Sequence, residues 1–396
     1  MLERRHQVRQ PRFVYDSLII SSVLCLIALG LLMVGSASMV ISDRQYGFAF
    51  YYLIRQVIYV SLGIVVAWVA TRVPLRLWEK YSRSLCLFGL FVLLLVLVPG
   101  IGRTVNGSRR WIHLGIVSLQ VSEFVKLTAV LYLSSYLARF RNQVKESLSG
   151  FIKPMILLAI IGVLLLLEPD FGGFIVISVT FLALLFVAEA RFMPFCVMFF
   201  FVLVCLGLLA VASPYRLLRL TTFLDPWKHA FSSGYQLTQS LIAFGRGGVL
   251  GVGLGNSIQK LFYLPEAHSD FVFAVLAEEL GLLGELFLIS LYIFFVTRLI
   301  VVANKAARFE MFYAKYVAYG VAFWLSCQAL INMGVNCGIL PTKGLTLPFI
   351  SYGGSSMIVT SLAVGVVLRV AYEVSLCSGD VRSASSPARS KKRRRS

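Results

Sequence analysis

The sequence predicts an all-α, polytopic integral membrane protein with about ten transmembrane helices. Of its 396 residues, 58% are hydrophobic and only 14% are charged, whereas a soluble domain typically carries about 25% charged residues. Ten apolar runs approach or reach the roughly 20 residues that a membrane-spanning helix needs. Lysine and arginine gather in alternate connections between these runs. This pattern excludes an ordinary soluble fold.

The apolar runs are joined by short connections except in one place. Residues 213–270 separate the seventh run from the eighth and contain glycine-rich and aromatic stretches. A connection of that length is expected to form a structured, functional loop. From the apolar periods we predict spans at approximately 17–38, 55–70, 84–99, 120–138, 154–167, 171–188, 192–212, 271–297, 314–339 and 348–374.

The charges between the runs predict the orientation. With a cytoplasmic N-terminus, the inner segments hold more than twice as many lysines and arginines as the outer loops, and cytoplasmic loops are the ones enriched in these residues. Both termini are therefore expected inside, with the loop 213–270 outside. We divide the chain into a basic tail (1–16), a transmembrane domain (17–375) and a basic tail (376–396) that we expect to be disordered.

The C-terminal KKRRR could indicate binding to nucleic acid or to membrane lipid. We favour the membrane, because basic segments beside a membrane helix fix topology or touch anionic lipid headgroups. No nucleic-acid partner is expected.

No sequence motif indicates a thiolate metal site or a nucleotide site. None of the seven cysteines falls in an outer loop, and there is no CxxC, so neither disulfides nor structural zinc are expected. The segment FGRGGVLGVGLG (244–255) lacks the Gly-Lys-Ser/Thr of a P-loop and the strand and helix of a dinucleotide fingerprint. We expect its glycines to allow close backbone packing or close approach of a substrate.

Acidic residues are scarce, and a group of them lies where the large outer loop enters the eighth span. The chain has 18 Asp and Glu residues, and Glu266 and Asp270 come directly before an apolar run. An ionisable group at that boundary is costly, which marks Asp270 as a candidate functional carboxylate. His268, Ser269 and Asp270 do not form a catalytic triad, because triad residues come from separated segments.

A second outer segment, residues 99–126, is rich in cations. Arg109 and Arg110 precede a tryptophan, and Glu123 and Lys126 are spaced to share one helix face. Interfacial anchoring and a Glu/Lys pair would explain these residues. We favour a second interpretation, in which Lys126 attracts an anionic lipid pyrophosphate. On that interpretation the outer cations are solvated, and Arg110→Ala or Lys126→Ala weakens substrate use more than folding.

Two further groups of polar residues lie in or beside spans. Glu168 and Asp170 form an outer turn, in which Asp170 is placed to cap the next helix. Gln328, Asn332 and Asn336 form one stripe of the ninth span. Interhelical hydrogen bonding and a polar cavity are both open as roles for this stripe.

Four motifs in this order closely resemble the SEDS family of bacterial cell-wall proteins. They are NGSRRWI (106–112), EPDFGG (168–173), LPEAHSDF (264–271) and LPTKGLTLPF (340–349). The match extends over roughly residues 15–375. The resemblance implies a ten-helix enzyme of the bacterial inner membrane, located at the division septum. It also implies the activity of that enzyme, a glycosyltransferase that polymerises lipid II into glycan strands on the outer face during septal cell-wall synthesis.

By motif position, the resemblance implies that Asp270 is the catalytic residue. The acceptor hydroxyl must displace a polyprenyl pyrophosphate, which asks for one base and for cations that stabilise the leaving group. Mg²⁺ or Mn²⁺ is an optional aid rather than an assigned cofactor, and no residue is assigned to a metal. The residues assigned to substrate binding are Arg109, Arg110, Lys126, Glu266, His268, Lys343 and Ser351.

The resemblance also implies partners: a class B penicillin-binding transpeptidase of the division machinery, other division membrane proteins and membrane lipid. Two alternatives to the enzyme stay open, a lipid II flippase and a scaffold that only recruits the transpeptidase. A transporter needs gates on both faces, whereas the chemically rich loops here cluster outside, so we favour the enzyme.

Overall fold

The computed structural model describes residues 15–100, 102–105, 108–114, 117–211 and 214–385. Each predicted span corresponds to a helix, which confirms the fold class. The ten helices are α1 (Ser17–Tyr46), α2 (Tyr51–Arg72), α3 (Leu75–Leu97), α4 (Val121–Arg139), α6 (Leu148–Leu167), α7 (Phe171–Val187), α8 (Phe192–Val211), α11 (Val272–Arg308), α12 (Phe312–Asn336) and α13 (Gly354–Ser385). Among the described residues, seven of these helices are long and apolar enough to cross a membrane, α7 and part of α8 are shorter apolar helices, and α4 falls in neither group.

Several helices are longer than the apolar runs that predicted them. At the N-terminal end Asp16 caps α1, since its carboxylate accepts hydrogen bonds from the backbone N–H groups of Leu18 and Ile19. At the other end α13 continues to Ser385, into the segment that we assigned to the tail. Residues 1–14 and 386–396 lie outside the described residues, so the predicted disorder of the tails stays a prediction.

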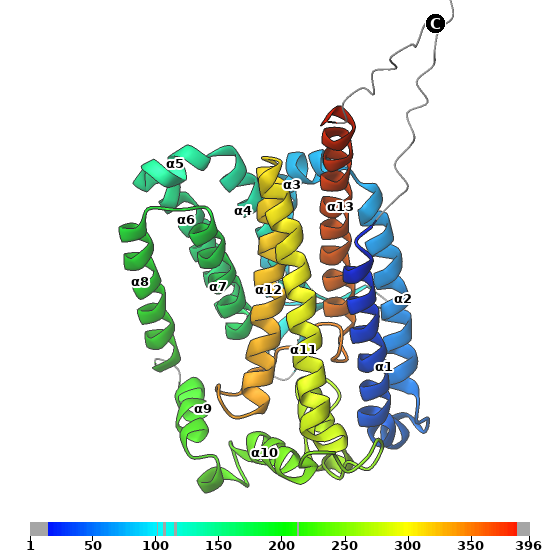
Figure 1. Cartoon of the computed structure of the whole chain (residues 1–396). Helices are drawn as coiled ribbons and strands as arrows, with labels where there is room; N and C mark the ends of the chain where they lie inside the picture. The colour runs from blue at the N-terminus through cyan, green and yellow to red at the C-terminus, as the bar shows by residue number, and fades with distance from the viewer. Residues whose placement is uncertain (1–14, 101, 106–107, 115–116, 212–213, 386–396) are drawn as a thin grey trace, which may run out of the picture.

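The helices pack into two apolar clusters. One is built mainly from α1, α2, α11, α12 and α13, and the other from α3, α4, α6 and α7. Figure 1 shows that the start of α1 and the end of α13 lie at the same end of the bundle, as an even number of spans requires. The opposite end, at the bottom of Figure 1, carries the large loop, with α9 (Pro214–Leu224), η1 (Trp227–His229), α10 (Tyr235–Gly247) and η2 (Gln259–Tyr263).

A small antiparallel sheet precedes α4, where the sequence analysis expected no strand. Its order is β1 (Arg103–Val105), β2 (Ser108–Leu114) and β3 (Val117–Gln120). β2 pairs with β3 through Trp111 opposite Gln120. The backbone N–H of Gln120 donates a hydrogen bond to Ser355 Oγ at 2.7 Å, which ties the sheet to the start of α13. The sheet therefore connects the cationic segment to the start of α13.

The glycine-rich segment of the outer loop packs against a break in α11. Gly281 adopts φ 64° and ψ −166° inside that helix, a backbone conformation that is essentially restricted to glycine. The N–H of Val252 donates to the carbonyl of Glu278 at 3.0 Å, so residues 247–255 supply partners for the interrupted helix. A Cβ at Gly281 would lie 2.3 Å from the backbone nitrogen of Gly251. Close backbone packing, one of the two roles expected for these glycines, is confirmed.

Gly281→Ala is expected to lower the melting temperature strongly, because the new Cβ meets backbone atoms and the conformation is strained by about 1–3 kcal/mol before that clash is counted. The matched control is Gly245→Ala in α10, where a Cβ meets nothing within 4 Å. Thermal unfolding of the purified variants makes the comparison. Equal melting temperatures for the two variants would contradict this account of the break.

Two neighbouring acids of α11 fasten the same loop. Glu278 accepts a hydrogen bond from the N–H of Ile258 at 3.0 Å and pairs with Arg246 at 3.2 Å. Glu279 pairs with Lys260 at 2.8 Å. Both carboxylates are fully buried, and buried charges persist where they are paired and hydrogen-bonded. These two acids therefore have a structural role, because they connect the outer loop to α11. Asp270, which precedes α11, is not engaged in this way.

Candidate active site

Asp270 lies in the tight turn that leads into α11. The turn is closed by Glu266, at φ 56°, whose carbonyl accepts hydrogen bonds from the N–H groups of Ser269 and Phe271. The Asp270 side chain is half-buried. Within the described ranges, no hydrogen bond reaches its carboxylate, whereas its backbone carbonyl accepts one from each of Asn332 and Asn336, at 2.9 and 3.0 Å. The backbone is fixed while the carboxylate is left available for chemistry.

The loop between α12 and α13 forms the wall beside this turn. Ser351 is buried and donates through Oγ to the carbonyl of Ser269 at 2.5 Å. The N–H of Tyr352 donates to the carbonyl of His268 at 2.9 Å. Gly344 lies so close to the Asp270 carboxylate that a Cβ there would be 2.9 Å from Oδ2. Ser351, assigned to substrate binding from the sequence, thus holds the turn that carries Asp270.

His268 and Glu266 also support this turn. The His268 ring is buried between Tyr52 and Tyr352, with ring centroids 4.6 and 5.6 Å away. Burial lowers the pKa of His268 below its ordinary value, and the charge of Glu266 opposes that shift. Glu266 is exposed and accepts a hydrogen bond from Ser269 Oγ at 2.7 Å. His268 is therefore a neutral, packed side chain in this structure.

Arg110 reaches from β2 to the turn between α6 and α7. Its Nε donates to the carbonyl of Glu168 at 3.2 Å, and its Nη2 donates to that of Pro169 at 2.5 Å. Its Nη1 lies 3.8 Å from Asp170 Oδ1. Asp170 caps α7 by accepting from the N–H of Gly173 at 3.0 Å, which confirms the predicted cap. The turn thus holds an arginine at the outer end of the bundle.

Two other cations border the same region. Lys343 lies with Nζ 4.3 Å from the ring centroid of Phe171, the first residue of α7. Arg219 of α9 donates through Nη1 to the carbonyl of Thr342 at 2.8 Å, two residues before Gly344. Arg110 and Arg219 therefore act on the Asp270 carboxyl, and Lys343 directly precedes Gly344, which lies beside that carboxyl.

The surroundings tune Asp270 toward the behaviour of a general base. Burial, followed by the charge of Glu266, raises the pKa of Asp270 to about 7, while Arg110 and Arg219 act in the opposite direction. Burial and the nearby Asp170 raise the pKa of Glu168 to about 8, so the carboxyl of Glu168 is largely uncharged at neutral pH. A base works best with a pKa near the operating pH, and that of Asp270 meets the condition.

The pKa of Asp270 predicts how activity depends on pH. A base accepts a proton only when it is deprotonated, so the rate is expected to rise with pH through about 7 and to fall roughly tenfold per pH unit well below that value. Turnover of the full-length protein between pH 5 and 9 measures this. A rate that stays constant down to pH 5 would contradict the assignment of this group as the base.

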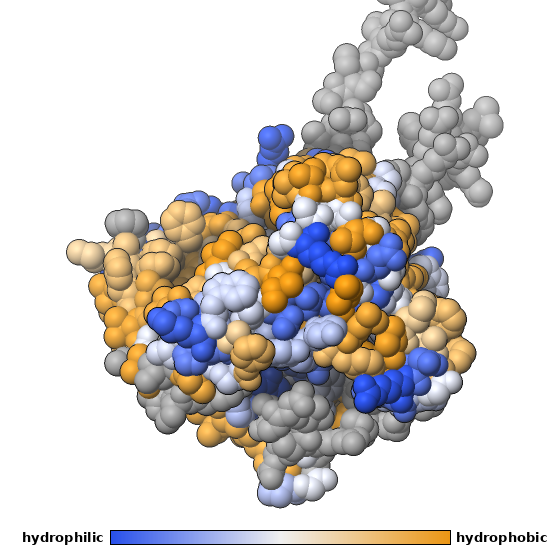
Figure 2. Space-filling view, turned by 90° about the horizontal axis from the view of Figure 1, so that it is seen from below, coloured by the Kyte–Doolittle hydropathy of each residue, from blue (hydrophilic) through white to orange (hydrophobic). Residues whose placement is uncertain are grey.

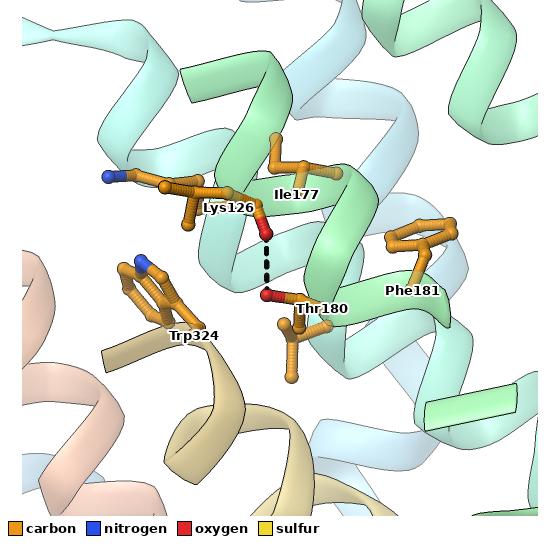
Figure 3. A pocket seen from close by; sticks show the side chains of 7 residues that line it. Lys126, Ile177, Thr180, Phe181 and Trp324 are labelled. Atoms are coloured by element: carbon orange, nitrogen blue, oxygen red, sulfur yellow. Dashed lines mark hydrogen bonds between the residues drawn. The ribbon is translucent and has the colours of Figure 1, made fainter. Parts of the chain in front are cut away.

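Lys126 lies inside the bundle rather than at the surface, and only 2% of its side chain is exposed. Its Nζ bonds to Glu123 Oε1 at 2.7 Å and to Gln328 Oε1 at 2.6 Å. Figure 3 shows Lys126 beside Trp324 at one side of a crevice that Ile177 also lines. That crevice has no room for a water molecule. The expectation of a solvated Lys126 is therefore wrong, because its ammonium group is already neutralised and bonded inside the protein.

Comparison with known proteins decides the family. Residues 16–376 match the family described as Cell cycle protein, whose model is named for FtsW, RodA and SpoVE. The chain belongs to this family. It is the SEDS family that the four motifs indicated, and the chain is a multi-pass membrane protein, as those motifs implied.

Similar SEDS proteins occur in bacteria. A probable peptidoglycan glycosyltransferase FtsW of Coxiella burnetii is 61% identical over 359 residues, which cover 91% of this chain and 96% of that protein. The Legionella pneumophila protein of the same name is 52% identical over 371 residues, 94% of each chain.

Solved structures agree with this family. A chain from a peptidoglycan synthase complex, studied for the coordination of polymerization and crosslinking, matches with TM-score 0.75 and 30% identity over 91% of this chain and 98% of that one. The rod shape determining protein RodA of Thermus thermophilus matches with TM-score 0.68 and 28% identity over 91% of this chain and 97% of that one.

Asp270, Arg110 and Lys343 of this candidate site were assigned from the sequence, whereas Arg219 was not. That residue lies on α9, inside the long loop that the sequence analysis treated as one unit. The available signal was an arginine in a short amphipathic segment just outside a span. Arg109 is placed on β2 opposite Thr104, but its side chain lies outside the described residues, so its predicted role stays a prediction.

Across the parts of the chain that the structure describes, no three His, Cys, Asp or Glu side chains come together in a way that could hold an ion. A bound Mg²⁺ or Mn²⁺ therefore has no protein cage of its own there.

Proposed function

We propose that this SEDS protein is a peptidoglycan glycosyltransferase that polymerises lipid II on the outer face of the bacterial inner membrane. The observation that carries the proposal is Asp270, a half-buried carboxylate with a pKa of about 7 that lies among outer cations. The names of the similar proteins, probable peptidoglycan glycosyltransferase FtsW, support it. The same relatives favour a role in septal wall synthesis during division.

In the proposed reaction Asp270 removes the proton from the acceptor sugar hydroxyl as the oxygen attacks the anomeric carbon of the donor. The bond from that carbon to the pyrophosphate oxygen breaks, and the polyprenyl pyrophosphate leaves with the electron pair. Arg110, Arg219 and Lys343 stabilise the charge of the leaving group. A pyrophosphate leaves without protonation, so a second catalytic acid is unnecessary, unlike in glycosidases. We also propose that Mg²⁺ or Mn²⁺ can bind together with the pyrophosphate of the substrate, since such ions are commonly held through substrate phosphates.

Arg219→Ala is expected to reduce kcat/KM for lipid II by about 10–100-fold, the loss typical of a charge-assisted hydrogen bond. Because Arg219 lowers the pKa of Asp270, its removal also moves the acid limb of the rate profile to higher pH. The control is Lys228→Ala, an exposed cation of the same loop that pairs with Asp225. A lower rate without a shift of the acid limb would place Arg219 away from Asp270.

The proposal includes a class B penicillin-binding transpeptidase as partner. The similar structure from a peptidoglycan synthase complex supports this class of partner. Figure 2 shows the end of the molecule that carries the outer loop, where apolar and hydrophilic side chains are interspersed. Leu224 and Phe231, in the outer loop, are 80% and 98% exposed, and exposed apolar residues of this size often mark contact surfaces. Other division membrane proteins are further proposed partners.

Purified full-length protein and fluorescent lipid II test the proposal. Glycan ladders that depend on the protein are the expected result. Translocation of lipid II across vesicle membranes without ladders would support a flippase instead. If neither occurs, with or without the transpeptidase, the protein is a scaffold and the proposal fails.

A further inference from the structure

The hydrogen bonds made by Asn332 carry a further inference, which rests on the proposed role of Asp270. Asn332 lies on α12 and is almost fully buried. Its Nδ2 donates to the carbonyl of Asp270 at 2.9 Å and to the carbonyl of Leu345 at 2.6 Å. A primary amide has two N–H donors, so this one group bonds both to the turn that carries Asp270 and to the loop between α12 and α13.

The two carbonyls belong to segments that must be aligned for chemistry. One is the carbonyl of the residue that carries the proposed base. The other follows Gly344, which the Asp270 carboxylate approaches closely, and the Leu345 side chain packs against Gly172 in the first turn of α7, next to the turn that holds Arg110. A shift between these two segments would change the distance from the base to the cations.

Asn336 strengthens the same arrangement one helical turn further on. Its Nδ2 donates to the Asp270 carbonyl at 3.0 Å and to the carbonyl of Asn332 at 2.8 Å. Its Oδ1 accepts from the N–H of Ala274 at 3.2 Å, within the first turn of α11. The Asp270 carbonyl is thus bonded by two amides of α12, and Asn332 also joins it to Leu345 of the neighbouring loop.

We propose that Asn332 is a positioning residue for the glycosyl transfer: it sets the distance between the Asp270 carboxylate and the loop that carries Lys343 by bonding to both backbones. Misplacement of a catalytic group by about 1 Å can cost about 100-fold in rate. Asn332 itself does not touch the reacting atoms.

The test measures kcat, KM and the pH profile of full-length Asn332→Ala with lipid II. We expect kcat to fall about 10–100-fold with KM within about threefold of wild type. We also expect the acid limb to move below pH 7, because a loosened turn exposes the Asp270 carboxyl to water and its pKa drops toward the ordinary value. Asn304→Ala, at the cytoplasmic end of α11, is the control with unchanged kinetics.

A purely structural role predicts a different result: a lower melting temperature with an unmoved pH profile for the protein that remains folded. That result overturns the proposal, and so does a wild-type kcat. If Asn332→Ala does not fold, Asn332→Gln decides, because it keeps the amide but displaces it by one methylene. Gln is expected to lower kcat, and a wild-type kcat for Gln overturns the proposal.

The outcome is separable from the test of the proposed function. If Asp270→Asn is active, the assignment of Asp270 as the base is wrong. An inactive Asp270→Asn together with wild-type behaviour of the Asn332 variants would remove only the positioning role.

Discussion

Asp270→Asn is expected to abolish glycan polymerisation while the protein folds and inserts normally. A general base contributes about 10²–10⁴-fold to the rate, so turnover should fall by at least about 100-fold. Asparagine keeps the shape of the side chain, and no described residue donates a hydrogen bond to the lost carboxylate. Since a half-buried charge is removed, the melting temperature should stay the same or rise slightly.

The control for this variant is Asp225→Asn, a carboxylate of the same outer loop that pairs with Lys228 and whose side chain is 42% exposed. It should keep its turnover within about twofold, because exposed ion pairs contribute little. Both variants are compared by glycan ladders and by thermal unfolding in the same detergent. Near-wild-type ladders from Asp270→Asn, or a large loss of its melting temperature, would each contradict the proposed role.

The position of Asp270 could be predicted because it depends on local features. An acid at the junction between a polar loop and a long apolar run has few explanations, and charge asymmetry between loops places that junction outside. The ten helices follow from the apolar runs for the same reason. The extension of α13 to Ser385 could not be predicted in this way, because hydropathy does not report on a helix that continues past the membrane.

The neighbours of Asp270 depend on long-range contacts that no local pattern contains. Arg219 meets Thr342, and Asn332 meets Asp270, across more than 60 residues of sequence. The amides of α12 recur every four residues in the sequence, but the sequence does not show which groups they bond to. The structure shows that two of these amides bond to the turn before α11, which favours hydrogen bonding between elements over a polar cavity.

Lys126→Ala is expected to destabilise the protein severely, which reverses the sequence-based expectation. The ammonium group is buried and bonds to Glu123 and Gln328. Its removal leaves the Glu123 carboxylate buried without a counter-ion, and breaking a buried pair in this way costs about 3–5 kcal/mol. The loss should appear as a large drop in melting temperature and in the yield of folded protein.

The double variant Glu123→Gln/Lys126→Met separates stability from substrate use. It removes both charges with side chains of similar length, and neutral replacement of a buried pair is often tolerated. We expect it to recover most of the melting temperature lost in Lys126→Ala. If the recovered protein polymerises lipid II at a rate near wild type, Lys126 has a structural role that connects α4 to α12 through Gln328. If stability returns and activity does not, the ammonium group contributes to the reaction despite its burial, as the family resemblance implies. Failure of the double variant to recover stability would show that the charge pair itself is needed for folding.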